Sequence, residues 1–143
     1  HGCRFPAYPP IVGSGENGCI LHYVENTSQM QSGDLVLMDA GGEYQSYSSD
    51  VTRTFPVNGS FTKPQSEIYN LVLKAQLAGI EEVKPGNRWD QIQQKMVFIL
   101  TEGLVELGIL SGKIDQLIAD KAYFKFYMHS SGHWLGLDTH DVG

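Results

Sequence analysis

The chain has 143 residues, of which 41% are hydrophobic and 18% are charged, and its formal net charge is −6. This composition is typical of a soluble globular domain with a core, and it excludes a disordered tail. The 10 Lys and Arg residues are scattered and no apolar run approaches the length of a membrane span, so we expect neither a nucleic-acid nor a membrane partner.

The cysteine content indicates the redox state of the cellular compartment in which the protein folds. Cys3 and Cys19 are too few for a disulfide scaffold, and they are not spaced as a C-x-x-C metal or redox pair. A reducing compartment is therefore the expectation. We expect a cytoplasmic location, or a mitochondrial one if a transit peptide lies upstream of His1.

The N-terminal part of the chain predicts a loop followed by one short strand. Residues 1–10 are rich in proline, which excludes a helix, and residues 13–18 continue as a turn. Residues 19–24, CILHYV, are typical of a short strand, from which His22 projects. A single histidine in such a position is more often a hydrogen-bonded structural residue than a catalytic one.

Two strand-like runs follow, and each carries one aspartate. Residues 35–39, LVLMD, form an apolar run that ends in Asp39, and residues 47–55 alternate and include Asp50. The glycine pair at 41–42 supplies turn torsions between the runs. We therefore predict a β-hairpin with one acidic residue on each arm.

The two hairpin carboxylates have two interpretations. Cross-strand neighbours lie about 4.5–5.5 Å apart at Cβ, so Asp39 and Asp50 can face each other and repel. One metal ion, or a pair of them, would relieve this repulsion. In the alternative interpretation, Asp39 caps the turn and Asp50 pairs with Arg53.

Three helices are predicted after the hairpin. Thr62 and Gln65 form the capping-box start of the first helix, the second begins near Asn87 or Trp89 and runs to Gly108, and a short third covers residues 113–120. The aromatic residues 123–128 predict a strand. Strands followed by helices and a further strand indicate an α+β fold.

The C-terminal block, HSSGHWLGLDTHDVG, contains three of the five histidines. His129, His133 and His140 converge only if Gly132 and Gly136 bend the chain. The alternative is a polar surface loop whose imidazoles share no role. The H-x-x-x-H spacing lacks the glutamate of the helical zinc motif, which argues against that class of site.

The hairpin carboxylates and one imidazole form an oxygen-dominated ligand set, which suits Mn(II). Three ligands are too few for two metal ions. Two further carboxylates after Gly143 would complete a dinuclear site. We therefore expect the chain to be a fragment.

Four separated blocks, SGENGCILHY, GDLVLMDAG, YSSDVTRTFPVNG and HSSGHWLGLDTHDVG, resemble the aminopeptidase P (Xaa-Pro aminopeptidase) branch of the pita-bread metallopeptidases. The resemblance covers essentially the whole chain and implies an incomplete α+β pita-bread fold, with a mixed or antiparallel curved sheet and helices on its outer face. It also implies that residues 1–143 are the N-terminal and central part of one catalytic domain, without a separate second domain.

The resemblance assigns site residues as well. Two aspartates and one imidazole match the family's metal ligands, and these are Asp39, Asp50 and His133. Three other histidines match catalytic residues that line the site, and these are His22, His129 and His140. The family's remaining ligands are two downstream glutamates, so the resemblance implies two Mn(II) ions per full-length site, with Zn(II) or Co(II) as alternatives.

The activity that the resemblance implies is the hydrolysis of the N-terminal residue from peptides with proline in second position, by a full-length homo-oligomer. The 143-residue fragment by itself is expected to be inactive. Gly132 stands where aminopeptidase P members often have Ser, and a Gly there is similar to prolidases and methionine aminopeptidases. A prolidase-type Xaa-Pro dipeptidase and a non-catalytic pita-bread binding domain are the alternative functions.

Overall fold

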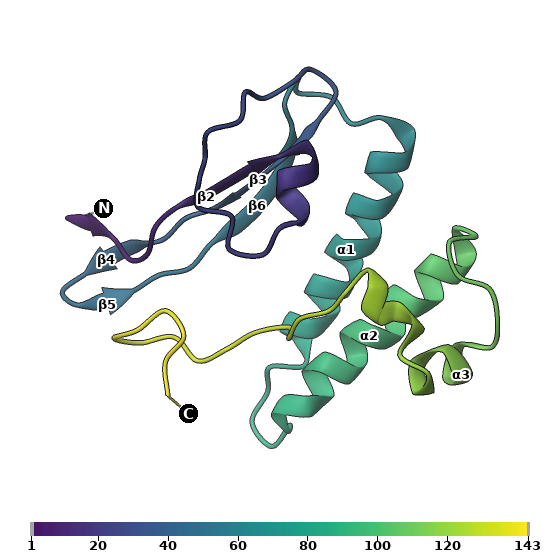
Figure 1. Ribbon diagram of the computed structural model, residues 1–143. Helices are drawn as coiled ribbons and strands as arrows, with labels where there is room; N and C mark the ends of the chain where they lie inside the picture. Colours follow the sequence, from purple (N-terminus) through teal and green to yellow (C-terminus); the bar gives the residue numbers. More distant parts are fainter. Residues whose placement is uncertain (1, 143) are drawn as a thin grey trace. The chain divides into compact units, whose positions relative to one another are not determined.

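The structure is a computed structural model that describes residues 2–142, and the chain divides into two compact units (Figure 1). The sheet unit comprises residues up to Thr62 together with the segment that begins at His133. The helical unit runs from Lys63 to Gly132. Each unit is described by itself below.

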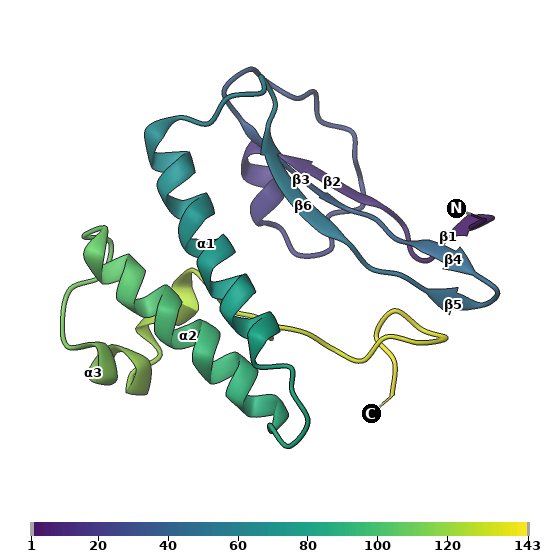
Figure 2. The same cartoon turned by 180° about the vertical axis from the view of Figure 1, so that it is seen from behind.

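The sheet unit contains two small antiparallel sheets. The first has the strand order β2-β3-β6 and consists of β2 (Ile11–Ser14), β3 (Leu35–Asp39) and β6 (Thr52–Pro56). The second has the order β1-β4-β5 and consists of β1 (Phe5–Pro6), β4 (Gly42–Tyr44) and β5 (Tyr47–Ser48). Figures 1 and 2 show β3 and β6 extending into β4 and β5 as one long ribbon. The predicted hairpin is therefore confirmed.

The turn of this hairpin differs from the prediction. Its two turn residues are Gln45, with a φ of 50°, and Ser46, with a φ of 71°. Positive φ at both residues is the geometry of a two-residue turn that matches the twist of the flanking strands. Gly41 serves another purpose, because a β-carbon there would lie 1.6 Å from the Ser49 carbonyl oxygen. Glycine permits close backbone approach as well as turning, and the sequence does not separate the two uses.

The predicted strand at residues 19–24 is wrong. The chain instead forms a 3-10 helix, η1 (Gly15–Cys19), and then a turn in which His22 has a φ of 56°. This left-handed torsion is incompatible with a strand. Part of the region predicted as a turn belongs to β2, whose Ile11 is buried.

The helical unit confirms the three predicted helices to within a few residues. They are α1 (Lys63–Glu81), α2 (Trp89–Glu106) and α3 (Ile114–Ala119). The predicted strand at residues 123–128 is wrong, because a second 3-10 helix, η2 (Ala122–Lys125), occupies its first part. Tyr127, which follows η2, packs against the helical core instead of pairing with another strand.

The core of the helical unit lies between α1 and α2. Its buried side chains are Leu71, Ala75, Ile99, Leu100 and Leu104. Gly103 allows the two helices to approach closely, since a β-carbon there would lie 2.2 Å from the Leu71 side chain. Within residues 2–142, no helix is sufficiently long and apolar to cross a lipid bilayer.

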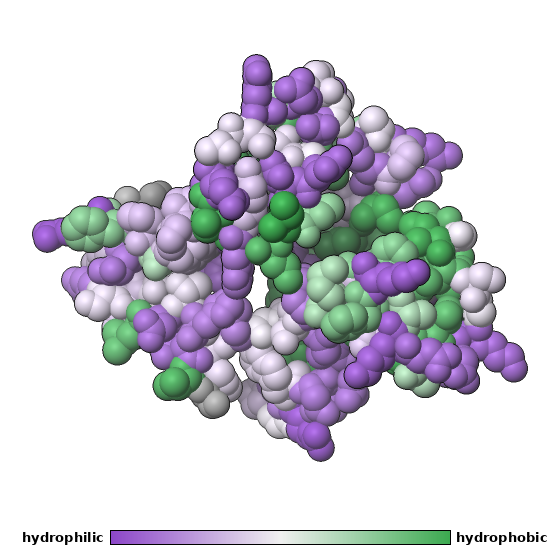
Figure 3. Space-filling model, viewed as in Figure 1, coloured by the Kyte–Doolittle hydropathy of each residue, from purple (hydrophilic) through white to green (hydrophobic). Residues whose placement is uncertain are grey.

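Apolar side chains are not confined to this core. Figure 3 shows hydrophobic residues gathered on the surface of the helical unit. The exposed apolar residues of α1 include Val72, Leu77 and Ile80, whose exposed fractions are 51%, 53% and 60%. Helix α1 therefore carries apolar residues on more than the face that contacts α2.

Candidate metal centre

The two hairpin aspartates occupy different kinds of position. Asp39 is the last residue of β3, and its cross-strand partner in β6 is Thr52. Asp50 lies outside the strands, between β5 and β6. The two aspartates are therefore not direct cross-strand partners. The Ala40 amide donates to the Val51 carbonyl at 3.2 Å, which keeps the two arms together at this level.

Tyr8 connects the two carboxylates. Its hydroxyl oxygen lies 2.5 Å from Asp39 Oδ1 and 3.0 Å from Asp50 Oδ1. A hydroxyl has one proton, so it donates to one carboxylate at a time and the pair shares it. Burial, together with hydrogen bonds to Asp39 and Asp50, raises the pKa of Tyr8 well above its ordinary value. Tyr8 therefore remains a proton donor at neutral pH.

The sequence analysis did not single out Tyr8. It stands in the proline-rich entry, FPAYPP, which carries no recognisable chemical motif. The signal that could have found it is the repulsion between Asp39 and Asp50, because two neighbouring carboxylates require a proton donor or a cation between them. The repulsion therefore predicts that a proton donor or a cation is present, but it does not indicate which residue supplies it.

His133 contacts the second carboxylate. Its Nε2 lies 3.0 Å from Asp50 Oδ2, and its Nδ1 lies 2.9 Å from the Trp134 carbonyl oxygen. A carbonyl oxygen only accepts, so Nδ1 must carry the proton of the neutral ring. Nε2 then presents a lone pair to a carboxylate. Such a contact is favourable only when a second ring proton or another cation is present.

These contacts overturn the alternative interpretation of the hairpin. Arg53 Nη1 donates to the Thr52 carbonyl at 2.8 Å, and no ion pair joins it to Asp50 within residues 2–142. Asp50 instead contacts Tyr8 and His133. The Asp39 carboxylate contacts Tyr8, so its role is in the cluster and not in capping the hairpin turn.

The C-terminal loop brings a second histidine to His133. The His133 and His140 ring centroids are 4.2 Å apart, and the His22 ring lies 5.9 Å from that of His140. The loop folds back on itself because the Asp141 amide donates to the Trp134 carbonyl at 3.0 Å. The rings of His22, His133 and His140 therefore lie close together, whereas His129 belongs to the other unit, and a shared role for the C-terminal histidines stays a prediction.

Gly136 is the bend of this loop. A β-carbon at Gly136 would lie 2.0 Å from the Asp141 carboxylate. Its carbonyl accepts a hydrogen bond of 2.8 Å from the Ser48 amide, which places the loop beside β5 (Figures 1 and 2). The predicted bend at this glycine is confirmed.

One hollow of about 290 Å³ collects most of these groups. Its polar lining comes from Tyr8, His22, Asp39, Asp50, Thr139 and His140. Ile11 and Val24 contribute apolar wall. A titratable cluster with an apolar wall is the kind of site in which a small polar ligand is oriented.

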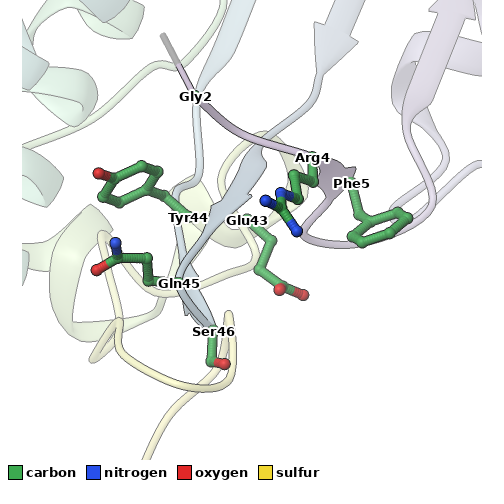
Figure 4. Close-up of a pocket in the computed structure, with 7 residues that line it drawn as sticks. All are labelled: Gly2, Arg4, Phe5, Glu43, Tyr44, Gln45 and Ser46. Carbon is green, nitrogen blue, oxygen red and sulfur yellow. The ribbon is translucent and has the colours of Figure 1, made fainter.

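A second hollow, of about 440 Å³, lies between β1 and the β4-β5 hairpin (Figure 4). Its lining residues are Gly2, Arg4, Phe5, Glu43, Tyr44, Gln45 and Ser46. Among the described residues 2–142, its lining contains one cation and one anion but no imidazole. These described residues do not offer the ligand set of a metal centre.

His129 belongs to the helical unit and is described with it. Its ring packs edge-on against Tyr127, with centroids 5.0 Å apart and an interplanar angle of 73°. Its Nδ1 lies 2.9 Å from the Ser130 carbonyl oxygen. The imidazole is thus held on two sides by residues of its own segment.

The donor chemistry of the cluster fits a divalent cation. Two carboxylates and one imidazole are ligands of this class, and the His133 ring donates its other N–H to a backbone carbonyl as metal-bound histidines do. The Tyr8 proton lies where a cation would relieve the repulsion between Asp39 and Asp50. No three His, Cys, Asp or Glu side chains of residues 2–142 close a metal site by themselves. The two carboxylates and the imidazole are therefore suitable ligands for a divalent cation, but they are too few to complete a site.

The match to a protein family gives the class of the protein, which is a metallopeptidase. The sequence profile of metallopeptidase family M24 matches residues 1–143. The chain belongs to this family.

Two bacterial proteins are similar in sequence to the chain over its whole length. It is 58% identical over 143 residues to a Xaa-Pro aminopeptidase of Haemophilus influenzae and 55% identical to that of Escherichia coli. The chain covers 33% and 32% of these proteins, so it spans about a third of their length.

Solved structures of aminopeptidases also match the chain. The aminopeptidase PepP of Pseudomonas aeruginosa matches 99% of the chain with a TM-score of 0.97 and 52% identity, and the match covers 32% of that protein. Structures of E. coli aminopeptidase P, with the same TM-score, include a complex with substrate and a zinc-substituted form with product. The expected α+β pita-bread fold is thereby confirmed, and all strand pairings within residues 2–142 are antiparallel.

Proposed function

We propose that the full-length protein is a metal-dependent Xaa-Pro aminopeptidase, which hydrolyses the N-terminal residue from peptides with proline in second position. Family membership and 58% identity to a protein of that name support the proposal. The structural observation that carries it is the His133 ring. Its Nδ1 is held by a carbonyl, and its Nε2 is directed at Asp50.

Asp39, Asp50 and His133 are the proposed ligands of Mn(II), with two ions in the complete site. Bound divalent ions supply a hydroxide nucleophile at neutral pH and polarise the scissile carbonyl. Asp50 is the proposed shared ligand, because it contacts both Tyr8 and His133 while Asp39 contacts Tyr8. We also propose that the full-length protein is cytoplasmic and homo-oligomeric.

His22, His129 and His140 are the proposed catalytic residues. His22 and His140 line the hollow beside the aspartates, where an imidazole N–H can donate to the peptide oxygen that becomes negative during hydrolysis. Tyr8 shares its proton between the two carboxylates and thereby orients both of them. Ile11 and Val24 form the apolar part of the lining.

The test is an assay of the purified full-length protein with tripeptides that differ only in having proline or alanine at the second position. We expect release of the first residue from the proline peptide alone, loss of this activity after chelation, and recovery on addition of Mn(II). Cleavage restricted to Xaa-Pro dipeptides would replace the proposal with a prolidase. Absence of cleavage by the metal-loaded protein would contradict it.

A further inference from the structure

Helix α2 holds the segment that carries His129. Gln93 Oε1 accepts hydrogen bonds from the Ser131 amide at 2.7 Å and from the Ser131 hydroxyl at 2.5 Å. These two residues are separated by 38 positions in the sequence. One helical turn earlier, the Trp89 ring lies 3.6 Å from the position of a β-carbon at Gly132. Positions four apart share a face of a helix, so this face of α2 supports the segment at two points.

Tyr127 completes the network. Its hydroxyl oxygen lies 2.6 Å from Ser131 Oγ and 3.4 Å from Gln93 Oε1. Because the Ser131 proton is directed at Gln93, the short contact is consistent with Tyr127 donating to Ser131. The order of donation is then Tyr127 to Ser131 to Gln93. The amide oxygen of Gln93 is the final acceptor of the network.

The Tyr127 ring is also the surface against which His129 packs, with a centroid distance of 5.0 Å. The Ser130 carbonyl engages His129 Nδ1. A carbonyl only accepts, so Nδ1 is the protonated nitrogen of the neutral ring and Nε2 carries no proton. The orientation of His129 therefore depends on the Tyr127 ring and on the backbone between residues 130 and 132.

We propose that Gln93 is a positioning residue, whose amide oxygen fixes the orientation of His129 through Ser131 and Tyr127. The proposal rests on the proposed function, in which His129 is catalytic. Without an acceptor at position 93, the Ser131 amide and hydroxyl lose their common partner. The segment then gains freedom, and misplacement of a catalytic group by about 1 Å can cost on the order of 10²-fold in rate.

The experiment uses the full-length, metal-loaded protein and two paired substitutions. Gln93→Leu removes the acceptor at similar volume, whereas Gln93→Glu keeps an acceptor oxygen. Gln94→Leu is the matched control, because Gln94 is exposed on the same helix and donates only to Asp90, at 3.2 Å. Each substitution is also made in a His129→Ala background. The readouts are hydrogen–deuterium exchange of residues 127–132, kcat, KM and metal content.

We expect Gln93→Leu to raise the exchange rate of the Ser131 amide at least about 10-fold and to lower kcat about 10- to 100-fold at unchanged metal content. Gln93→Glu should restore both values, and Gln94→Leu should change neither. In the His129→Ala background, Gln93→Leu should have no further effect on kcat, because both changes act through one group.

Two results would overturn the proposal. Unchanged exchange at Ser131 in Gln93→Leu would show that Gln93 does not hold the segment. Equal losses of kcat with and without His129 would show that Gln93 acts through something else. A wild-type protein without peptidase activity would remove the proposed function and the catalytic part of this inference, and the exchange data would then decide only whether Gln93 holds the segment.

Discussion

His133 Nε2 lies 3.0 Å from the carboxylate of Asp50, a residue 83 positions earlier in the chain. The contact links the hairpin to the C-terminal loop, and the proposed cation site rests mainly on it. The Asp50 side chain is partly buried, with an exposed fraction of 22%, and that of His133 is 35% exposed. An uncompensated carboxylate in such a position is unfavourable, so Asp50 is where the ligand assignment is most sensitive to substitution.

Replacement of Asp50 by Asn should abolish metal binding and turnover together. The substitution keeps the size of the side chain but removes the charge that contacts both Tyr8 and His133. We expect metal content and kcat to fall in parallel, while the circular dichroism spectrum stays native. Asp115→Asn, at an exposed position of α3, is the control. Unchanged Mn(II) content with full activity in the Asp50 variant would refute the assignment.

Replacement of Tyr8 by Phe should destabilise the metal-free protein more than the metal-loaded one. Without metal, the Tyr8 hydroxyl lies between Asp39 and Asp50, and its proton reduces the repulsion between the two carboxylates. A hydrogen bond to a charged group contributes about 1.5–3 kcal/mol, so we expect a loss of about that size in the unfolding free energy of the metal-free protein. Urea denaturation with and without Mn(II) measures it. Equal losses in the two forms would count against a cation taking the place of the hydroxyl proton.

The same residue predicts a dependence of stability on pH. The pKa of Tyr8 is raised in the folded protein, by burial first and then by hydrogen bonds to Asp39 and Asp50. Above the ordinary tyrosine pKa of about 10, the unfolded chain releases this proton while the folded protein retains it. The contribution of Tyr8 is therefore complete below pH 10 and declines above it. Denaturation between pH 8 and 11, without metal, should show a steeper loss for the wild type than for Tyr8→Phe.

His22 and His140 should act on substrate and not on metal. Both line the hollow, and within residues 2–142 neither makes a carboxylate contact like that of His133. Alanine at either position should lower kcat by about 10²–10³, the cost of losing one donor to a developing oxyanion. Metal content, measured by plasma mass spectrometry, should stay at the wild-type value. Loss of metal from the His140 variant would make that residue a ligand.

Substitution by Ser should be tolerated at Gly132 but should disrupt the C-terminal loop at Gly136. Gly132 has an ordinary φ, and a β-carbon there lies at a normal contact distance of 3.6 Å from Trp89, so stability should change by less than about 0.5 kcal/mol. At Gly136 the added carbon would lie 2.0 Å from the Asp141 carboxylate, which disrupts the loop that carries His140. Thermal unfolding and peptidase assays of the two variants test this contrast. A damaging Ser at Gly132 would contradict it.

Local patterns in the sequence account for much of the fold. The apolar run LVLMD predicts β3 to the residue, and apolar spacing predicts α1, α2 and α3, because their signals lie within a few neighbouring residues. CILHYV carries a similar strand signal but forms a turn, since the torsion at His22 depends on the structure around it.

The site was predictable in part, and through resemblance more than through spacing. Motifs predicted Asp39, Asp50 and His133 as ligands, and the structure brings His133 to Asp50, whereas the contacts of Tyr8 with both aspartates arise from hydrogen bonds across 31 and 42 positions. Gln93 is similar, because it meets Ser131 across 38 positions. No periodicity encodes such contacts, since they exist only after the chain has folded.

The most direct test of the central claim is a crystal structure of the full-length protein grown with Mn(II), with an anomalous difference map recorded on both sides of the manganese absorption edge. The account predicts two peaks beside Asp50, one of them bonded to His133 Nε2 and the other to Asp39. Peaks remote from these three side chains, or bonding through His133 Nδ1, would contradict it.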